Sequence, residues 1–200
     1  MKSKKLFDIR KEALNGLYYD NRNRLIASKW KLNLLYYGLP IIIATSLILL
    51  NQKLTEDSIT YFITGISIFA GLFFNLLIVV SDKMDKRKKQ LESDYEPTSD
   101  YANDYKLFSE RLIASISYAI ILSILVIGLM FFTQIDYGNL DKFLSAKTIK
   151  WINNISDYTF NFLSYFVGLK FLILLVHILI DIYDMLIHDM NLQQHQKDGE

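Results

Sequence analysis

The chain has 200 residues, 52% of them hydrophobic, and a formal net charge of +1. It contains no cysteine, which excludes disulfides, thiolate metal sites and a cysteine nucleophile. Although the net charge is near zero, the charged residues are unevenly distributed along the chain. Most of them lie outside four apolar runs, which are 32–50, 59–81, 112–133 and 158–180. As a helix, each run is long enough to cross a hydrocarbon core, which takes about 20 residues. We therefore predict an all-α, polytopic membrane protein with four transmembrane helices in one domain, 32–180.

The leader, residues 1–31, is predicted to contain an amphipathic helix. Leu6, Ile9, Ala13 and Leu17 recur at helical spacing among basic side chains. Two arrangements use this stripe equally well: an interfacial helix on anionic lipid, or a cytoplasmic helix packed on its own bundle. A cleavable secretory signal is not expected, because the first apolar run starts late and has no small-residue cleavage site.

The distribution of lysine and arginine predicts the orientation. Nine lysine and arginine residues lie in 1–31, seven in 82–111 and one in 181–200. The segments 51–58 and 134–157 contain one and three. Membrane proteins retain an excess of positive charge on the cytoplasmic side. Both termini and the 82–111 connector are therefore expected on the cytoplasmic side of the membrane.

Small residues form matching stripes on the second and third predicted spans. The stripe on the second span is Ser67, Gly71 and Asn75, and the stripe on the third is Ser115, Ala119 and Ser123. Small side chains at four-residue spacing let helix backbones approach closely. The stripes fit packing between spans of one chain or contact between copies of the chain. In either arrangement the Asn75 amide needs a hydrogen-bond partner.

The two longer connectors have features of their own. The cytoplasmic connector opens on a basic run, Lys86, Arg87, Lys88 and Lys89. This run fits an orientation signal, a contact with lipid headgroups or a docked protein. The second half of the connector is acidic and interleaved with tyrosine, an efficient interface residue, so it is a candidate surface for a soluble partner. The external connector, 134–157, is predicted to form one or two short amphipathic helices, with Trp151 at headgroup depth.

Lys170 lies near the middle of the fourth apolar run. An ionisable group at that depth costs a few kcal/mol or more unless it has an interior partner or a wet cavity. On a helical wheel, His177, Asp181, Asp184 and His188 fall on the same side as Lys170, so the five make one stripe. We expect this stripe to face the bundle interior, a water-filled path or another subunit.

Three interpretations of the stripe remain open. In the first, it lines a conduit formed by several copies, where Lys170 is an electrostatic barrier and His177 titrates near neutral pH. In the second, it is structural, with Lys170 paired to a carbonyl, a hydroxyl or Asn75 and the other groups solvated. In the third, the two histidines and two aspartates offer nitrogen and oxygen ligands to a divalent ion. We assign no residue as a metal ligand.

The sequence has no enzyme signature. It lacks a phosphate-cradling glycine loop, a nucleophile elbow and an HExxH zinc motif. The short basic run stands beside an acidic stretch that repels phosphate, so direct nucleic-acid binding is not expected. We predict neither an enzyme nor a cofactor-binding protein.

The layout resembles small membrane proteins of bacterial anti-phage defence operons, and most of all the four-span membrane subunit of Kiwa-type systems. The resemblance covers the whole chain and rests on size, four spans, the basic leader, the charged connector and the composition of an A+T-rich gene. No residue-level motif accompanies it, so it assigns no functional residue. It implies a homo-oligomer that senses membrane disturbance, or disrupts the membrane, together with a cytosolic partner.

The predicted function is therefore an oligomeric inner-membrane sensor or effector in defence or stress response that perturbs membrane permeability. It is expected to contact membrane lipids, further copies of itself, and a cytosolic protein through 1–31, 82–111 and the 181–200 tail. The alternative is a small ion channel or transporter subunit that acts alone.

Overall fold

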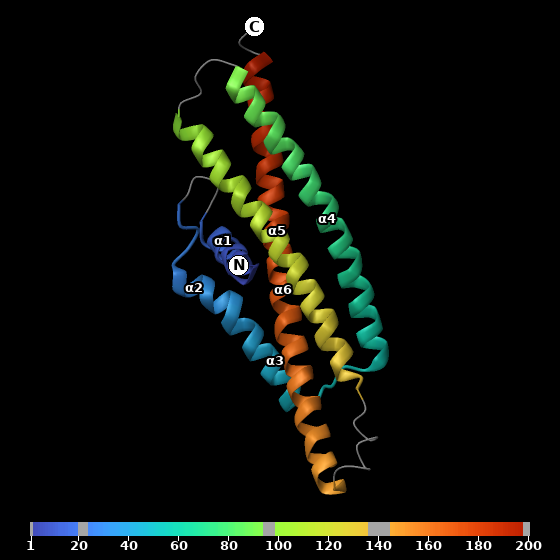
Figure 1. Cartoon of the computed structure of the whole chain (residues 1–200). Helices are drawn as coiled ribbons and strands as arrows, with labels where there is room; N and C mark the ends of the chain where they lie inside the picture. The colour runs from blue at the N-terminus through green and yellow to red at the C-terminus, as the bar shows by residue number, and fades with distance from the viewer. Residues whose placement is uncertain (1, 20–23, 94–98, 136–144, 198–200) are drawn as a thin grey trace. The chain divides into compact units, whose positions relative to one another are not determined.

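The structure is a computed structural model that describes residues 2–19, 24–93, 99–135 and 145–197 (Figure 1). Within these residues the fold is all-α, as the sequence predicts. The elements are α1 (Lys2–Tyr18), α2 (Lys29–Asn33), a π-helical turn η1 (Leu34–Gly38), α3 (Leu39–Leu49), α4 (Glu56–Ser93), α5 (Ser99–Thr133) and α6 (Ala146–Lys197).

Four stretches of helix are long and apolar enough to cross a membrane, which confirms the four predicted spans. They are Lys29–Leu49, Glu56–Lys83, Lys106–Thr133 and Lys147–Ile187. In the first two stretches only 17% of the most apolar window is buried, against 56% and 39% in the third and fourth. The first two therefore leave most of their apolar side chains for lipid or another protein to cover.

The helices extend well beyond the apolar runs, so less of the chain is loop than the sequence indicated. The basic run of the 82–111 connector continues α4 as helix. On the other side, α6 already begins at Ala146, so the segment around Trp151 is the first part of α6 rather than a separate short helix. Neither proline nor glycine occurs between Ala146 and Tyr158, and nothing in the sequence ends a helix there. The rest of the predicted external helix, 140–144, lies outside the described residues.

Pro40 accounts for the irregular start of the first span. The N–H of Leu39 bonds to the carbonyl of Leu34, five residues back instead of the usual four. Pro40 follows at once and has no N–H to donate to the carbonyl of Tyr36. The helix therefore widens into a π-helical turn before it continues as α3. Such turns are frequent at functional sites, and this one carries Tyr36 and Tyr37.

The described helices form two compact units, and α4, α5 and α6 contribute residues to both. The leader unit comprises Met1–Ile26, Leu77–Tyr118 and Leu172–Glu200. The lysine unit comprises Ala27–Leu76 and Ala119–Phe171. Fully buried apolar side chains hold each unit together, with Leu112 and Leu174 in the former and Ala44, Val126 and Phe171 in the latter.

Candidate functional site

Lys170 lies inside the lysine unit, enclosed by aromatic rings. Its Nζ is 4.5 Å from the ring centroid of Tyr36, 4.4 Å from that of Tyr37 and 5.4 Å from that of Phe166. Lys170 is 6% exposed and Tyr36 is 4% exposed. A cation this close to a desolvated ring gains about 2 kcal/mol. The three rings, called here the aromatic cage, therefore replace part of the hydration that an ammonium loses inside a membrane.

Two elements supply the aromatic cage. Phe166 precedes Lys170 by one helical turn, so both side chains share a face of α6. Tyr36 and Tyr37 are neighbours in η1, and their rings pack edge to face with centroids 5.0 Å apart. Because a π-helical turn holds more residues than an α-helical one, consecutive side chains in it diverge less. The turn beside Pro40 therefore allows both tyrosines to reach one cation.

These contacts favour the structural interpretation of Lys170 over a lysine that lines an open path. The contacts described for Lys170 are aromatic faces, whereas the sequence suggested a carbonyl, a hydroxyl or the Asn75 amide as its partner. The Asn75 side chain is exposed on α4. Sequence reasoning missed both tyrosines. In the sequence they are a pair of aromatic residues close to Pro40 in an apolar run. Such a pair does not predict which other span its side chains contact.

His177 and Asp181 belong to the leader unit, where His177 meets the end of α1. The Nε2–H of His177 donates a hydrogen bond to the backbone carbonyl of Gly16 at 3.0 Å. The last carbonyls of a helix have no partner within the helix, so His177 caps α1 from α6. The same Nε2 lies 3.8 Å from Oδ2 of Asp181, one turn further along α6. The carboxylate therefore lies beside the capping ring.

The remaining stripe residues make no comparable contact that the structure describes. Asp184 is exposed, and His188 lies in α6 but its side chain is outside the described residues. Among the side chains that are described, no three of His, Asp or Glu are placed to hold a metal ion. The described residues of the stripe therefore lie in different environments. Lys170 is surrounded by aromatic rings, His177 caps α1 with Asp181 beside it, and Asp184 is exposed.

Gly16 of α1 lies against α5. A Cβ atom at Gly16 would lie 3.0 Å from Oγ of Ser115 and 3.6 Å from Cβ of Arg111. The Arg111 guanidinium also lies 5.1 Å from the ring centroid of Tyr19, just beyond the end of α1. Glycine therefore lets the backbone of α1 rest directly on α5.

A valine at Gly16 is expected to loosen α1 at a cost of about 2 kcal/mol, because overpacking a close contact costs about 1–3 kcal/mol. The loss is measured as faster proteolysis of the leader in the full-length protein. Gly128→Val is the matched control, since a Cβ there meets nothing within 4 Å. In a Ser115→Ala background the Gly16 substitution should cost less. Equal protease resistance of the Gly16→Val protein and the unaltered one would show that this contact does not hold α1.

The two small-residue stripes lie in opposite environments. Ser115, Ala119 and Ser123 on α5 are all 0% exposed. Ser67, Gly71 and Asn75 on α4, called here the α4 stripe, are all exposed, and a Cβ at Gly71 would meet nothing within 4 Å. Packing within the chain therefore covers the α5 stripe and leaves the α4 stripe on an outward face. The side chains of Lys86, Arg87, Lys88 and Lys89, further along α4, lie outside the described residues.

A polar cluster that sequence reasoning missed ties the turn between α3 and α4 to α6, within the lysine unit. The Asn161 side chain accepts a hydrogen bond from the Leu54 N–H at 2.9 Å and donates one to the Asp157 backbone carbonyl at 2.8 Å. The Tyr165 hydroxyl donates to the carbonyl of Gln52 at 3.1 Å. Asn161 is only 2% exposed. The cluster therefore satisfies backbone groups of the turn that its own helices cannot reach.

An ion pair completes this cluster at the surface. Lys53 in the turn pairs with Asp157, and its Nζ lies 5.2 Å from the ring centroid of Tyr158. The hydrogen bond to Asp157 raises the pKa of Lys53 above its ordinary value of 10.5. Asp157, Asn161 and Tyr165 follow one another at four-residue spacing, so they share one face of α6. This four-residue spacing is the feature of the sequence from which the cluster could have been predicted. We call Lys53, Asp157, Asn161 and Tyr165 the turn clamp.

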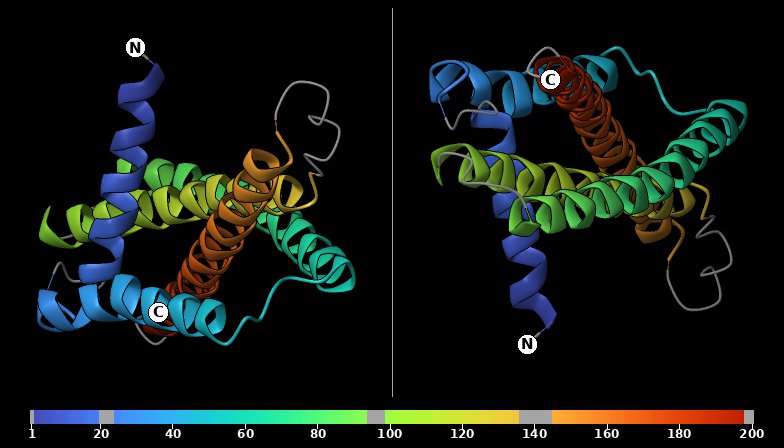
Figure 2. Two further views of the ribbon diagram at one scale, coloured as in Figure 1. Left: turned by 90° about the horizontal axis from the view of Figure 1, so that it is seen from below. Right: turned by 90° about the horizontal axis from the view of Figure 1, so that it is seen from above.

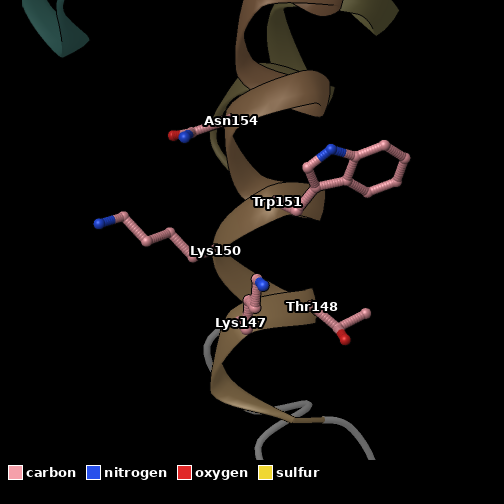
Figure 3. Close-up of a pocket in the computed structure, with 5 residues that line it drawn as sticks. All are labelled: Lys147, Thr148, Lys150, Trp151 and Asn154. Atoms are coloured by element: carbon pink, nitrogen blue, oxygen red, sulfur yellow. The ribbon is translucent and has the colours of Figure 1, made fainter.

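A hollow of about 440 Å³ lies at the start of α6, lined by Lys147, Thr148, Lys150, Trp151 and Asn154. All five side chains come from one helix and point away from it in different directions (Figure 3). Lys150 and Asn154 extend to the opposite side from Trp151. Since they do not converge on a common point, we assign no ligand to this hollow.

The fold defines an all-α membrane protein with four helices of membrane-crossing length, a caged lysine in the fourth and a leader helix capped by a histidine. Comparison of the chain with family models, with curated proteins and with solved structures found no match. The geometry described above is therefore the basis of the functional conclusion.

Proposed function

We propose that the protein is an oligomeric sensor or effector of the bacterial inner membrane, which acts with a cytosolic partner in anti-phage defence or stress response and perturbs membrane permeability. The observation that carries the proposal is the outward position of the α4 stripe. An amide left unpaired in hydrocarbon costs several kcal/mol. Asn75 is exposed on a helix of membrane-crossing length, so a second copy of the chain is a suitable source of its hydrogen bonds.

The α4 stripe is suited to contact with itself. An asparagine side chain both donates and accepts, so two copies related by a two-fold axis satisfy each other's amides. Gly71 and Ser67 present little bulk, which lets two α4 backbones approach closely. The same contact would cover the neighbouring side chains of Ile68 and Leu72, which are 60% and 56% exposed.

The partner half of the proposal is supported by the shape of the helices and by the charges. All three long helices extend past their apolar runs. α4 continues to Ser93, α5 already begins at Ser99, and α6 continues to Lys197. With the basic leader, these extensions lie on the side that the lysine and arginine distribution assigns to the cytoplasm. They offer a soluble protein a helical surface next to the membrane.

A channel that acts alone needs a polar path within one chain. Lys170 is instead closed off by three aromatic rings. The oligomeric effector is therefore the better supported of the two functions, and any permeability change is expected to arise between copies of the chain.

Cysteine cross-linking tests the oligomer, since the natural chain contains no cysteine. We expect Gly71→Cys to give a disulfide-linked dimer in native membranes, because bridged Cα atoms lie about 4.4–6.8 Å apart. Gly65→Cys is the matched control, since Gly65 is on the same helix but off the α4 stripe, and it should stay monomeric. Absence of cross-linking at position 71, or equal cross-linking at both positions, would contradict the proposed contact.

Purification from mild detergent tests the partner. We expect one dominant cytosolic protein to accompany the full-length chain, and its recovery to fall when Gly16→Val loosens the leader. Recovery of the membrane protein alone would count against a partnered effector and leave the dimer result unaffected.

A further inference from the structure

The leader helix α1 is packed at one end and exposed at the other. Ala13 and Leu17 are 0% and 7% exposed, and His177 caps the carbonyl of Gly16 between them. The same apolar stripe continues toward the N-terminus to Leu6, which is 53% exposed, and the adjacent Phe7 is 64% exposed. Within the part of the chain that the structure describes, protein covers the second half of the stripe and leaves Leu6 exposed.

The position of α1 in its unit places the exposed half at a membrane boundary. Within the leader unit, α1 runs across the parts of α5 and α6 that belong to this unit rather than alongside them (Figure 2). Because α5 and α6 have membrane-crossing length, a helix that runs across them lies along the membrane plane. Its depth follows from its contacts: Arg111 immediately precedes the apolar run 112–133, and His177 lies in the last turn of the run 158–180. Both place α1 where acyl chains meet headgroups.

The charges of α1 fit this position. On a helical wheel, Asp8 and Glu12 lie opposite the side that carries Leu6 and Phe7. Basic side chains at such a boundary keep their stems in apolar surroundings and extend their charge to headgroup phosphates. The basic residues of this half whose side chains are described are Lys5, Arg10 and Lys11.

We propose that the first half of α1 inserts Leu6 and Phe7 into the adjacent leaflet, and that the partner of this face is an anionic phospholipid surface. Each basic residue near such a surface strengthens binding about fivefold. The second half of α1 is tied to α5 and α6 through Gly16, which holds the first half next to this leaflet. This inference holds whether or not the chain forms oligomers or binds a soluble partner.

A fluorescent reporter in the full-length protein tests the proposal. The two natural tryptophans, Trp30 and Trp151, are replaced by phenylalanine, and Phe7→Trp is reconstituted in nanodiscs of phosphatidylcholine with or without phosphatidylglycerol. Glu12→Trp in the same background is the matched control on the opposite face. We expect the indole at position 7 to be blue-shifted, and quenched by brominated acyl chains at least about twofold more strongly than the indole at position 12. Omitting phosphatidylglycerol, or replacing the basic residues of this half by glutamine, should reduce the difference.

Three outcomes would overturn the proposal. Equal, weak quenching at positions 7 and 12 would place this half of α1 in water. Quenching at position 7 that stays the same without phosphatidylglycerol and in the glutamine variant would show that this face does not need an anionic surface. A blue-shifted indole at position 7 that brominated lipid does not quench would show that protein covers this face. Monodisperse elution and unchanged helical circular dichroism establish that each variant is folded.

Discussion

Replacement of Tyr36 by leucine is expected to destabilise the protein by about 2 kcal/mol, whereas phenylalanine at the same position should cost much less. Leucine fills part of the space but has no ring quadrupole, so Lys170 remains buried with one aromatic face fewer. Removing one partner of a buried charge is costly, because the desolvated charge stays behind. Phenylalanine keeps the ring and loses only the hydroxyl. The free energy of unfolding of both variants is measured in the same nanodiscs.

A double-mutant cycle with Lys170 identifies the cause of this loss. Methionine resembles the lysine stem without its charge, and an apolar group in place of a buried charge is often neutral or stabilising. We therefore expect Lys170→Met to keep or raise the unfolding free energy. In the Lys170→Met background Tyr36→Leu should lose most of its effect, with a coupling energy of about 1–2 kcal/mol. An undiminished effect of Tyr36→Leu there would mean that the ring does not act through the cation.

Asn161→Leu should destabilise the lysine unit by about 2–3 kcal/mol. Leucine is close to asparagine in size but leaves the Leu54 N–H without its acceptor and removes the donor to Asp157. An unsatisfied buried polar group costs about 1–3 kcal/mol. The measurement is thermal unfolding in nanodiscs, together with proteolysis at the turn between α3 and α4, which should become faster.

Tyr165→Phe is the control from the same turn clamp. It removes one hydrogen bond, to the Gln52 carbonyl, from a less buried position, so it should cost no more than about 1 kcal/mol. If Asn161→Leu were as mild as Tyr165→Phe, and the turn stayed resistant to protease, the turn clamp would not be what fixes this turn on α6.

The spans were predictable from sequence because apolar length is a local property. A run such as 112–133 can be assigned as a helix of membrane-crossing length from its own residues, whatever it packs against. The continuity of α6 was less accessible. An amphipathic pattern around Trp151 has the same period whether it forms a separate helix or the first turns of a long one. Only the absence of proline and glycine before Tyr158 distinguishes the two.

The environment of Lys170 was predictable only in part. Burial energetics require an interior partner for a charge in the fourth run, and the structure gives one. Which groups serve is decided by how the first span packs against α6, and no local pattern encodes that. Tyr36 and Tyr37 are far from Lys170 in sequence, and the π-helical turn that aims them depends on Pro40.

The two arrangements considered for the leader could not be separated by sequence, because both use the stripe of Leu6, Ala13 and Leu17. The structure packs Ala13 and Leu17 within the leader unit and leaves Leu6 exposed. The small-residue stripes pose the same problem. Their spacing is identical on α4 and α5, yet only tertiary packing determines that Ser115 is buried and Gly71 is exposed.

The most direct test of the account is a cryo-electron microscopy map of the full-length protein in lipid nanodiscs, at a resolution that shows side chains. The central claim is that the charge in the fourth helix is housed by rings of the same chain. Density for the Lys170 amine should lie between the rings of Tyr36 and Tyr37 and next to Phe166. An amine directed at acyl chains, or into a wide water-filled lumen, would contradict the claim.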